Sequence, residues 1–238
     1  MRQTDKILLG GDLLNIVLLL GGHIFNKIRK GELEEIKKIT NLLRRLLRDG
    51  NRIAVVAGGG GLAREYIDLS EKLGAPKAVQ DIIGIEATRL NAMILISALS
   101  DISYPCVPSS YEEAVKGFSS KGLVIMGGIA PAQSTDAVAA VMAELTRADI
   151  LIKASEKGGV YERDPNEDPN ARKYERMTYD ELEKIILEKK FLPGRYDLLD
   201  YLALLILRRS NIPLAIVPPN AESIEKALKG EITGTLVT

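Results

Sequence analysis

Short runs of consecutive apolar residues alternate along the chain with longer segments in which apolar residues return every three or four positions. Such a run predicts a buried strand, because the strands of a parallel sheet are covered on both faces. The three-to-four spacing predicts helices that bury one face. The expected strands span 15–20, 53–57, 104–107, 123–126, 150–154, 214–217 and 235–237, and the expected helices span 32–48, 62–73, 81–99, 111–118, 135–147, 179–189, 199–210 and 221–228.

The order of these elements predicts an α/β fold. Strands that alternate with helices form a mostly parallel sheet with helices on both faces. Right-handed connections bring the carboxyl ends of the strands to one edge, where ligands bind in open α/β sheets. The 238 residues are expected to form a single domain, 1–238, with residues 1–14 as an additional leader, because no repeat, low-complexity segment or long linker divides the chain.

Charge and cysteine content narrow the classes of function. The chain has 32 basic and 32 acidic residues, so neither nucleic acid nor an acidic membrane surface is the expected partner. Cys106 is the single cysteine and His23 the single histidine, which excludes a disulfide framework and any multi-cysteine or multi-histidine metal site. The apolar segment at 7–20 is interrupted by Asp12 and Asn15 and is too short to span a bilayer. A reducing, cytoplasmic location is expected.

The sequence IAVVAGGGGLAR at 53–64 carries the strongest local signal. A buried strand, a run of glycines and the start of a helix make an anion site, because glycines let backbone N–H groups approach a phosphate and the helix dipole favours negative charge. Arg64, in the first helical turn, can add a bidentate contact. The alternative is a tight turn without a ligand. The run fits neither the P-loop pattern nor the dinucleotide-binding pattern.

Two more strands end in glycine pairs. Gly21-Gly22 follows the first expected strand, and Gly127-Gly128 follows the strand at 123–126. Because parallel strands end at the same edge, all these glycines are expected to lie close together. Several glycine loops at one edge indicate a polyphosphate, or two phosphate-bearing ligands side by side.

Four segments resemble, in order and spacing, the archaeal uridylate (UMP) kinases of the amino acid kinase superfamily: IAVVAGGGGLAREYI, DIIGIEATRLNAMIL, VIMGGIAPAQSTDAVAA and GGVYERDP. The resemblance implies a three-layer α/β/α sandwich with a mostly parallel central sheet, assembled as a homohexamer. It also implies transfer of the γ-phosphoryl group of Mg-ATP to UMP, which gives UDP and ADP. The expected ligands are therefore ATP and UMP. Mg²⁺ enters with ATP, and no residue is assigned as a metal ligand.

The resemblance also implies roles for individual residues. Those expected to bind ATP are Gly22, His23, Gly60, Arg64, Ser155, Tyr161 and Asp164. Those expected to bind UMP are Gly59, Asp81, Ile129, Ala130, Pro131, Ala132, Gln133, Ser134 and Thr135. Arg64 and Asp136 are expected to act in the transfer step.

Each side chain on the UMP side has an alternative reading. Asp81 can accept hydrogen bonds from ribose hydroxyls, or it can be the N-cap of the following helix. Ser134, Thr135 and the backbone behind them can hold the UMP phosphate, and Ser134 or Thr135 is also the expected helix cap. Asp136 can orient Mg²⁺ or a basic side chain, or it can simply favour the helix dipole.

Two residues on the ATP side also have structural alternatives. Tyr161 can pack on adenine, or it can cover part of the core. Asp164 precedes Pro165 and can serve only to shape a turn.

The chain departs from the superfamily pattern at positions that matter for charge. Leu19 replaces a lysine that is frequent in the first strand, and Leu205 replaces a usual lysine of the late helix. In the loop that usually reads T-N-V-D-G-V-Y, Glu156 replaces the asparagine and Gly158 the aspartate. Ala132 replaces the glycine of the UMP loop. Phosphoryl transfer depends on neutralising charge, so fewer basic residues predict slower transfer.

Three basic residues lie near these positions in the sequence, Lys153, Lys157 and Arg195. Each taken singly is interpreted as a solvated surface charge. If the loop is extended, Glu156 is expected on a different side of the chain from residue 158, which makes it a poor substitute for the missing aspartate. Replacing Gly158 by aspartate is therefore expected to raise kcat.

Three other functions remain open at this stage. The altered loop around Gly158 fits a non-catalytic nucleotide-binding paralogue or regulatory subunit. His23, beside the first glycine pair, keeps open another phosphotransferase, such as an isopentenyl phosphate kinase. A storage role like that of the related molybdate-storage proteins is a more distant alternative.

Overall fold

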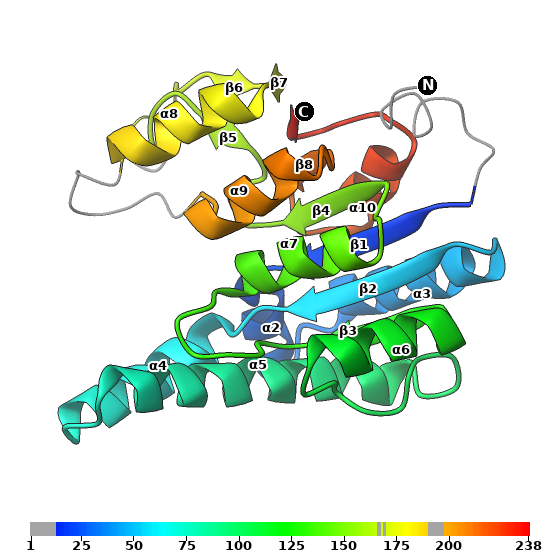
Figure 1. The fold of residues 1–238 in the computed structure, drawn as a ribbon, viewed down its shortest axis with the longest axis vertical. Coiled ribbons are helices and arrows are strands. Elements are labelled where there is room, and N and C mark those ends of the chain that lie inside the picture. Colours follow the sequence, from blue (N-terminus) through cyan, green and yellow to red (C-terminus); the bar gives the residue numbers. More distant parts are fainter. Residues whose placement is uncertain (1–12, 166–167, 169, 190–197) are drawn as a thin grey trace.

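The computed structural model describes residues 13–165, 168, 170–189 and 198–238 (Figure 1). Its main sheet has seven strands in the order β3-β2-β1-β4-β8-β9-β7. They span Leu123–Met126 (β3), Arg52–Ala57 (β2), Asn15–Leu20 (β1), Ile150–Ala154 (β4), Leu214–Val217 (β8), Thr235–Val237 (β9) and Arg176–Met177 (β7). A second sheet pairs β5 (Val160–Tyr161) with β6 (Lys173–Tyr174).

The main sheet is mostly parallel. Strand β1 pairs in parallel with both β2 and β4, and Leu19 is the register partner of Val56 on one side and of Lys153 on the other. Strand β9 pairs antiparallel with β8. The strands β1 to β4 consist almost entirely of buried residues, as expected for strands covered on both faces.

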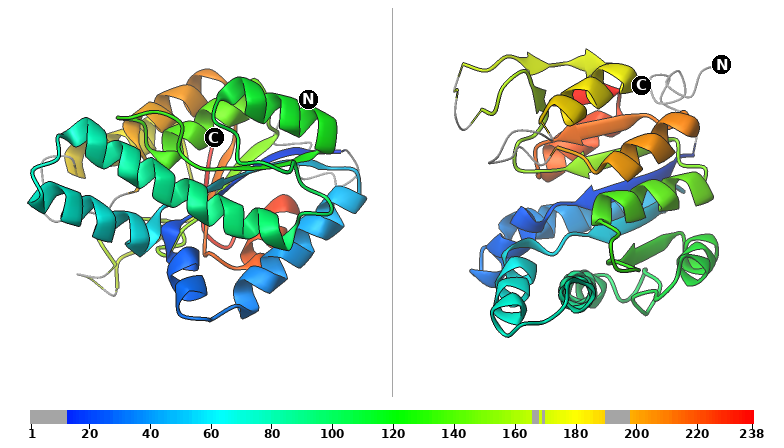
Figure 2. Two further views of the ribbon diagram at one scale, coloured as in Figure 1. Left: turned by 90° about the horizontal axis from the view of Figure 1, so that it is seen from below. Right: turned by 60° about the vertical axis from the view of Figure 1, so that its left-hand side comes forward.

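Helices cover both faces of the sheet, which gives three layers (Figure 2). Side chains from α6, α7, α8 and α9 pack on one face, and side chains from α2, α3, α5 and α10 pack on the other. The helices span Gly22–Arg29 (α2), Glu34–Arg48 (α3), Gly60–Lys72 (α4), Lys77–Ala98 (α5), Tyr111–Lys121 (α6), Thr135–Leu145 (α7), Tyr179–Lys189 (α8), Tyr201–Arg209 (α9) and Ala221–Leu228 (α10). The predicted α/β/α sandwich is therefore confirmed.

The two core clusters follow the alternation of strand side chains. On β1, Val17 and Leu19 face the α7 side of the sheet, whereas Ile16, Leu18 and Leu20 face the α3 side. Strand β4 alternates in the same way. Its Leu151 belongs to the α7 side, and its Ile150, Ile152 and Ala154 belong to the α3 side.

Most strands have the predicted bounds, but the prediction was wrong at four places. Residues 104–107 do not form a strand, although the Tyr104 N–H donates to the Leu123 carbonyl at 2.8 Å. Helix α2 was missed, as were the two-residue strands β5, β6 and β7. Helix α5 begins at Lys77 rather than at Asp81, because Pro76 is its N-cap.

Within the described ranges, no helix combines the length and the apolar character needed to cross a membrane.

Candidate active site

The three glycine segments meet at the carboxyl edge of the sheet, as the strand order requires. The Gly58 N–H donates to the Leu20 carbonyl and the Gly21 N–H donates to the Ala154 carbonyl, both at 2.9 Å. A Cβ atom on Gly22 would lie 2.2 Å from Gly60 Cα, so only glycine permits this approach of the two loops. The glycines therefore bring the ends of β1, β2 and β4 together around one opening.

That opening is a cavity of 750 Å³. Its lining includes many of the residues expected from the sequence: Gly22, His23, Gly59, Gly60, Arg64, Asp81, Ala130, Ala132, Gln133, Ser134, Thr135 and Ser155. Other expected residues are not part of its lining: Ile129, Pro131, Asp136, Tyr161 and Asp164. Three further lining residues carried no expectation from the sequence: Asn26, Thr88 and Leu198. Lys157, one of the three basic candidates, also lines the cavity.

One side of the cavity is the N-terminus of α4. This helix begins at Gly60, which has a φ of +65°, a conformation that favours glycine. Asn26 on α2 accepts a hydrogen bond from the Gly61 N–H at 2.6 Å and so fixes the loop. Arg64 is exposed in the first turns of α4 and lines the cavity. The loop thus presents backbone and one guanidinium to the same space.

Helix α5 holds two of the glycine loops from behind. The buried Asn91 donates from its side-chain amide to the carbonyls of Gly58 and Gly59, at 2.8 and 3.2 Å. The hydroxyl of Thr88, also buried, accepts from the Gly128 N–H at 2.6 Å. These two side chains lie one helical turn apart, so α5 sets the relative position of the loops after β2 and β3.

The loop between β3 and α7 is tied to α5 by Asp81. The Asp81 carboxylate accepts from the Ala132 N–H at 2.9 Å, and Ala132 has a φ of +60°. Asp81 lies inside α5, so the alternative that it is the N-cap of this helix is wrong. Alanine therefore occupies a left-handed position here, a conformation that favours glycine.

Helix α7 begins at the cavity and is capped by Ser134. The Ser134 hydroxyl accepts from the Ala137 N–H at 3.1 Å and donates to the carboxylate of Asp200. Thr135 is the first residue of the helix. The free N–H groups of the first turn of a helix favour an anion, so this end of α7 suits a phosphate.

Asp136, the next residue, has a basic partner. Lys153 Nζ lies 2.8 and 2.7 Å from the two Asp136 carboxylate oxygens and 2.9 Å from the Leu198 carbonyl oxygen. The interpretation of Lys153 as a solvated surface charge is therefore wrong, because Lys153 is only 8% exposed. Arg195, the third basic candidate, lies outside the described residues.

The loop after β4 brings charged side chains to the other side of the cavity. Ser155, Glu156 and Lys157 line it, and Glu156 lies 3.4 Å from His23 Nδ1. The Glu156 side chain therefore does reach the cavity, which the expectation of a poor substitute did not include. Lys157 Nζ contacts the Asp164 carboxylate at 2.7 Å, which places Asp164 behind Lys157. Tyr161 is half-buried on β5 and packs against the α7-side core.

Gly158 has a structural reason to be glycine. Its φ is +63°, and a Cβ atom there would lie 2.9 Å from Pro218 Cγ and 3.1 Å from Pro218 N. A proline ring and a backbone atom give way little, so a side chain at this position strains the loop. The expectation that Gly158→Asp raises kcat is therefore not supported.

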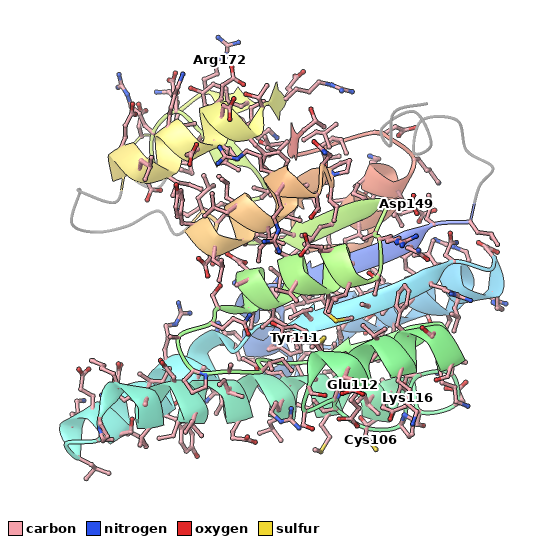
Figure 3. All side chains as sticks on the ribbon, viewed as in Figure 1. Cys106, Tyr111, Glu112, Lys116, Asp149 and Arg172 are labelled. Atoms are coloured by element: carbon pink, nitrogen blue, oxygen red, sulfur yellow. The ribbon has the colours of Figure 1, made fainter. Side chains whose placement is uncertain are left out.

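Tyr111, labelled in Figure 3, is the first residue of α6 and packs against the α7-side core. Burial raises the pKa of Tyr111 to about 12, so the phenol stays protonated at neutral pH. Gln133, which lines the cavity, is the side chain that the phenol neighbours. The Tyr111 phenol therefore adds no charge beside Gln133 at neutral pH.

No group of three histidine, cysteine, aspartate or glutamate side chains gathers in the described part of the chain. The carboxylates of Glu156 and Asp81 line the cavity, and Asp136 and Asp164 are paired with lysines. Mg²⁺ usually takes one or two carboxylates together with substrate phosphates and water. The donor set therefore fits a Mg²⁺ ion that arrives on a nucleotide rather than one held in a protein cage.

A parallel α/β/α sandwich with glycine loops and helix N-termini around one cavity is the architecture of a protein that binds phosphate-bearing ligands. The chain belongs to the amino acid kinase family, whose model matches residues 15–218. It is 38% identical over 224 residues to the uridylate kinase of Methanocaldococcus jannaschii, a match that covers 94% of this chain and 99% of the relative. It is 41% identical to the uridylate kinase of Pyrobaculum calidifontis, with the same coverage. The crystal structure of uridylate kinase from Archaeoglobus fulgidus matches with a TM-score of 0.85 and 39% identity, covering 94% of this chain and 100% of that one.

Proposed function

We propose that this protein is a UMP kinase, which transfers the γ-phosphoryl group of ATP to UMP. The observation that carries the proposal is the cavity of 750 Å³ at the carboxyl edge of the sheet, because glycine loops from three strand ends and two helix N-termini open into it. Such a cavity suits two phosphate-bearing ligands placed end to end. Relatives at about 40% identity that are named uridylate kinases support the choice of UMP as the acceptor.

ATP binds on the side formed by the loop after β1, the start of α4 and the loop after β4. Backbone N–H groups of Gly22 and Gly60 approach its phosphates, and Arg64 adds a charged donor. His23 and Ser155 complete this side. Tyr161 and Asp164 do not line the cavity and act from further away. Asp164 holds Lys157, which does line it.

UMP binds on the side formed by α5, the loop at 129–135 and the start of α7. One carboxylate oxygen of Asp81 holds the Ala132 N–H and the other accepts from a ribose hydroxyl. The first turn of α7, with Thr135, receives the UMP phosphate. Gly59 and the remainder of the loop, Ile129 to Gln133, surround the nucleoside.

The chain's own residues act in the transfer by positioning and by electrostatic stabilisation. Arg64 and Lys157 lie on the ATP side, and the α7 N-terminus lies on the UMP side, so the γ-phosphoryl group would pass between positive potentials. A Mg²⁺ ion that arrives with ATP would neutralise part of the negative charge of the phosphates, and the carboxylates of Asp81 and Glu156 are cavity-lining side chains that could hold it. No covalent enzyme intermediate is needed.

The decisive experiment is an assay of ADP release with Mg-ATP and UMP, CMP or isopentenyl phosphate as acceptor. We expect transfer to UMP, weaker transfer to CMP and none to isopentenyl phosphate. Transfer to isopentenyl phosphate alone would assign the cavity to a different kinase. Binding of ATP and UMP by calorimetry without any transfer would instead support a non-catalytic nucleotide-binding protein.

We also propose that the protein forms a homo-oligomer, as the resemblance to hexameric kinases implies. Support comes from apolar side chains that α4 and α5 leave exposed: Tyr66, Leu69, Leu73, Val79, Ile82, Leu90 and Met93. These helices run along the lower edge of the molecule in Figure 1. Leu73, the C-cap of α4, is 88% exposed. Large exposed apolar patches are typical of an interface.

A further inference from the structure

Lys153 differs from the other basic side chains of the protein. Among the residues that the structure describes, it is the one buried lysine or arginine. It lies on the central strand β4, and its register partner on β1 is the apolar Leu19. Burial of an ammonium group is costly unless hydrogen bonds compensate for the lost water. A buried lysine at this depth therefore calls for a specific set of partners.

Those partners come from two segments that border the cavity. Lys153 Nζ contacts both carboxylate oxygens of Asp136, at the start of α7, and the carbonyl oxygen of Leu198, just before α9. Leu198 itself lines the cavity. Two residues after Lys153, Ser155 lines the opposite side. One ammonium group thus joins three chain segments at the base of the site.

Further hydrogen bonds extend this contact to the start of α7. The Asp200 N–H donates to the Asp136 carboxylate at 3.1 Å, and the Asp200 carboxylate accepts from the Ser134 hydroxyl. Ser134 in turn caps α7. The position of the α7 N-terminus therefore depends on a chain of contacts that begins at Lys153.

We propose that Lys153 is a positioning residue for phosphoryl transfer, acting through Asp136. It fixes the α7 N-terminus, which receives the UMP phosphate, relative to the loop after β4, which borders ATP. This inference rests on the proposed function and names a residue that does not line the cavity. In-line transfer needs the acceptor oxygen at the correct distance and direction, so a small shift of one side lowers the rate more than it lowers binding.

The test is a double-mutant cycle with Lys153→Met, Asp136→Asn and the double variant, assayed with UMP and Mg-ATP. We expect each single change to lower kcat by about tenfold or more. Both KM values are expected to stay within about threefold of the wild type, because the cavity lining is intact. Since the two residues act as one unit, the double variant should lose no more kcat than the worse single variant.

The control is Ile39→Ala, a substitution in the core on the α3 side of the sheet. It lowers stability without touching the Lys153 contacts, so its kcat well below the unfolding temperature should match the wild type. If the control loses kcat as Lys153→Met does, the effect of Lys153 is one of general stability and the inference fails.

Other outcomes separate the inference from the proposed function. An active wild type with unchanged kcat in Lys153→Met overturns the inference alone, and so do losses that multiply in the double variant. A wild type without any transfer overturns the proposed function. If a single variant does not fold, the double variant, which buries no unpaired charge, decides by itself. A tenfold loss of its kcat at unchanged KM supports the inference, and wild-type kcat overturns it.

Discussion

Arg64 is the exposed guanidinium beside the α4 glycine loop, and it tests the ATP side of the cavity directly. Arg64→Ala removes a permanently charged donor, so we expect ATP affinity to fall by about 1–3 kcal/mol. Titration calorimetry with ATP measures this change. Arg52→Ala is the matched control, because Arg52 is also exposed but begins β2 at the opposite end of the strand. Unchanged ATP affinity in Arg64→Ala would remove this residue from the site.

Ala132 holds a backbone conformation that alanine adopts at a cost. Its φ is +60°, and its N–H is fixed by the Asp81 carboxylate. Ala132→Gly relieves the strain but adds freedom to the unfolded chain, so we expect a net stabilisation of about 0.5–1 kcal/mol. Urea unfolding measures it. Ala130→Gly, at a position without a positive φ, should destabilise instead, and equal effects at both positions would contradict this account.

Gly158 is the position where structure and sequence lead to opposite predictions. The altered motif predicts that aspartate restores activity, whereas the φ of +63° and the contact with Pro218 predict strain. We expect Gly158→Asp to destabilise the fold by about 2–4 kcal/mol without a gain in kcat. Gly74→Asp is the control, because Gly74 also has a positive φ but a Cβ atom there would have no neighbour within 4 Å. A stable Gly158→Asp variant with higher kcat would restore the prediction made from the sequence.

At the scale of elements, the strands and glycine loops were predictable from the sequence. The side chains that hold them in place were not. Apolar runs identified β1, β3, β4 and β8 with their observed bounds. Asn91 and Thr88 were missed because they contact loops more than 30 residues away, and nothing near them in the sequence records that contact. Lys153 was misread for the same reason. A single lysine in a strand pattern does not reveal the carboxylate that packs against it from another helix.

Asn91 provides the test at this scale. Asn91→Leu keeps the approximate size of the buried side chain but leaves the buried Gly58 carbonyl without this donor. The Gly59 carbonyl keeps the Ala63 N–H at 3.4 Å. We expect a loss of about 1–3 kcal/mol in the free energy of unfolding, because a buried acceptor remains unsatisfied. The affinity for ATP should also fall, since these carbonyls belong to the glycine loop. Ser97→Ala, an exposed change on the same helix, is the control. Equal stability of the two variants would show that Asn91 does not support the loop.

At the scale of the whole molecule, the order of elements was enough to predict the layers. Alternating strands and helices imply a parallel sheet, and the observed order of strands agrees. The short strands β5, β6 and β7 have two residues each, so no hydrophobic period marks them. Local sequence patterns also do not predict which face of α5 is exposed. Its apolar residues occupy both sides of the helix, and only the fold separates those that pack on the sheet from those left exposed.

The exposed apolar side of α4 and α5 gives the last prediction. Four exposed apolar residues of α5 are spaced so that they share one side of the helix over its length: Val79, Ile82, Leu90 and Met93. If this side lies between subunits, Ile82→Glu with Met93→Glu places charges in a buried contact and should shift the protein to monomers at micromolar concentration. Sedimentation velocity measures the shift.

A matched change elsewhere distinguishes an interface from a general loss of solubility or folding. Leu187, on α8, is also an exposed apolar residue, and it belongs to a different part of the surface. Leu187→Glu should leave the oligomer intact, because the charge enters water rather than a contact. Circular dichroism should show folded protein in both variants. A wild type that sediments as a monomer, or an oligomer that tolerates both charges on α5, would mean that these helices do not join subunits.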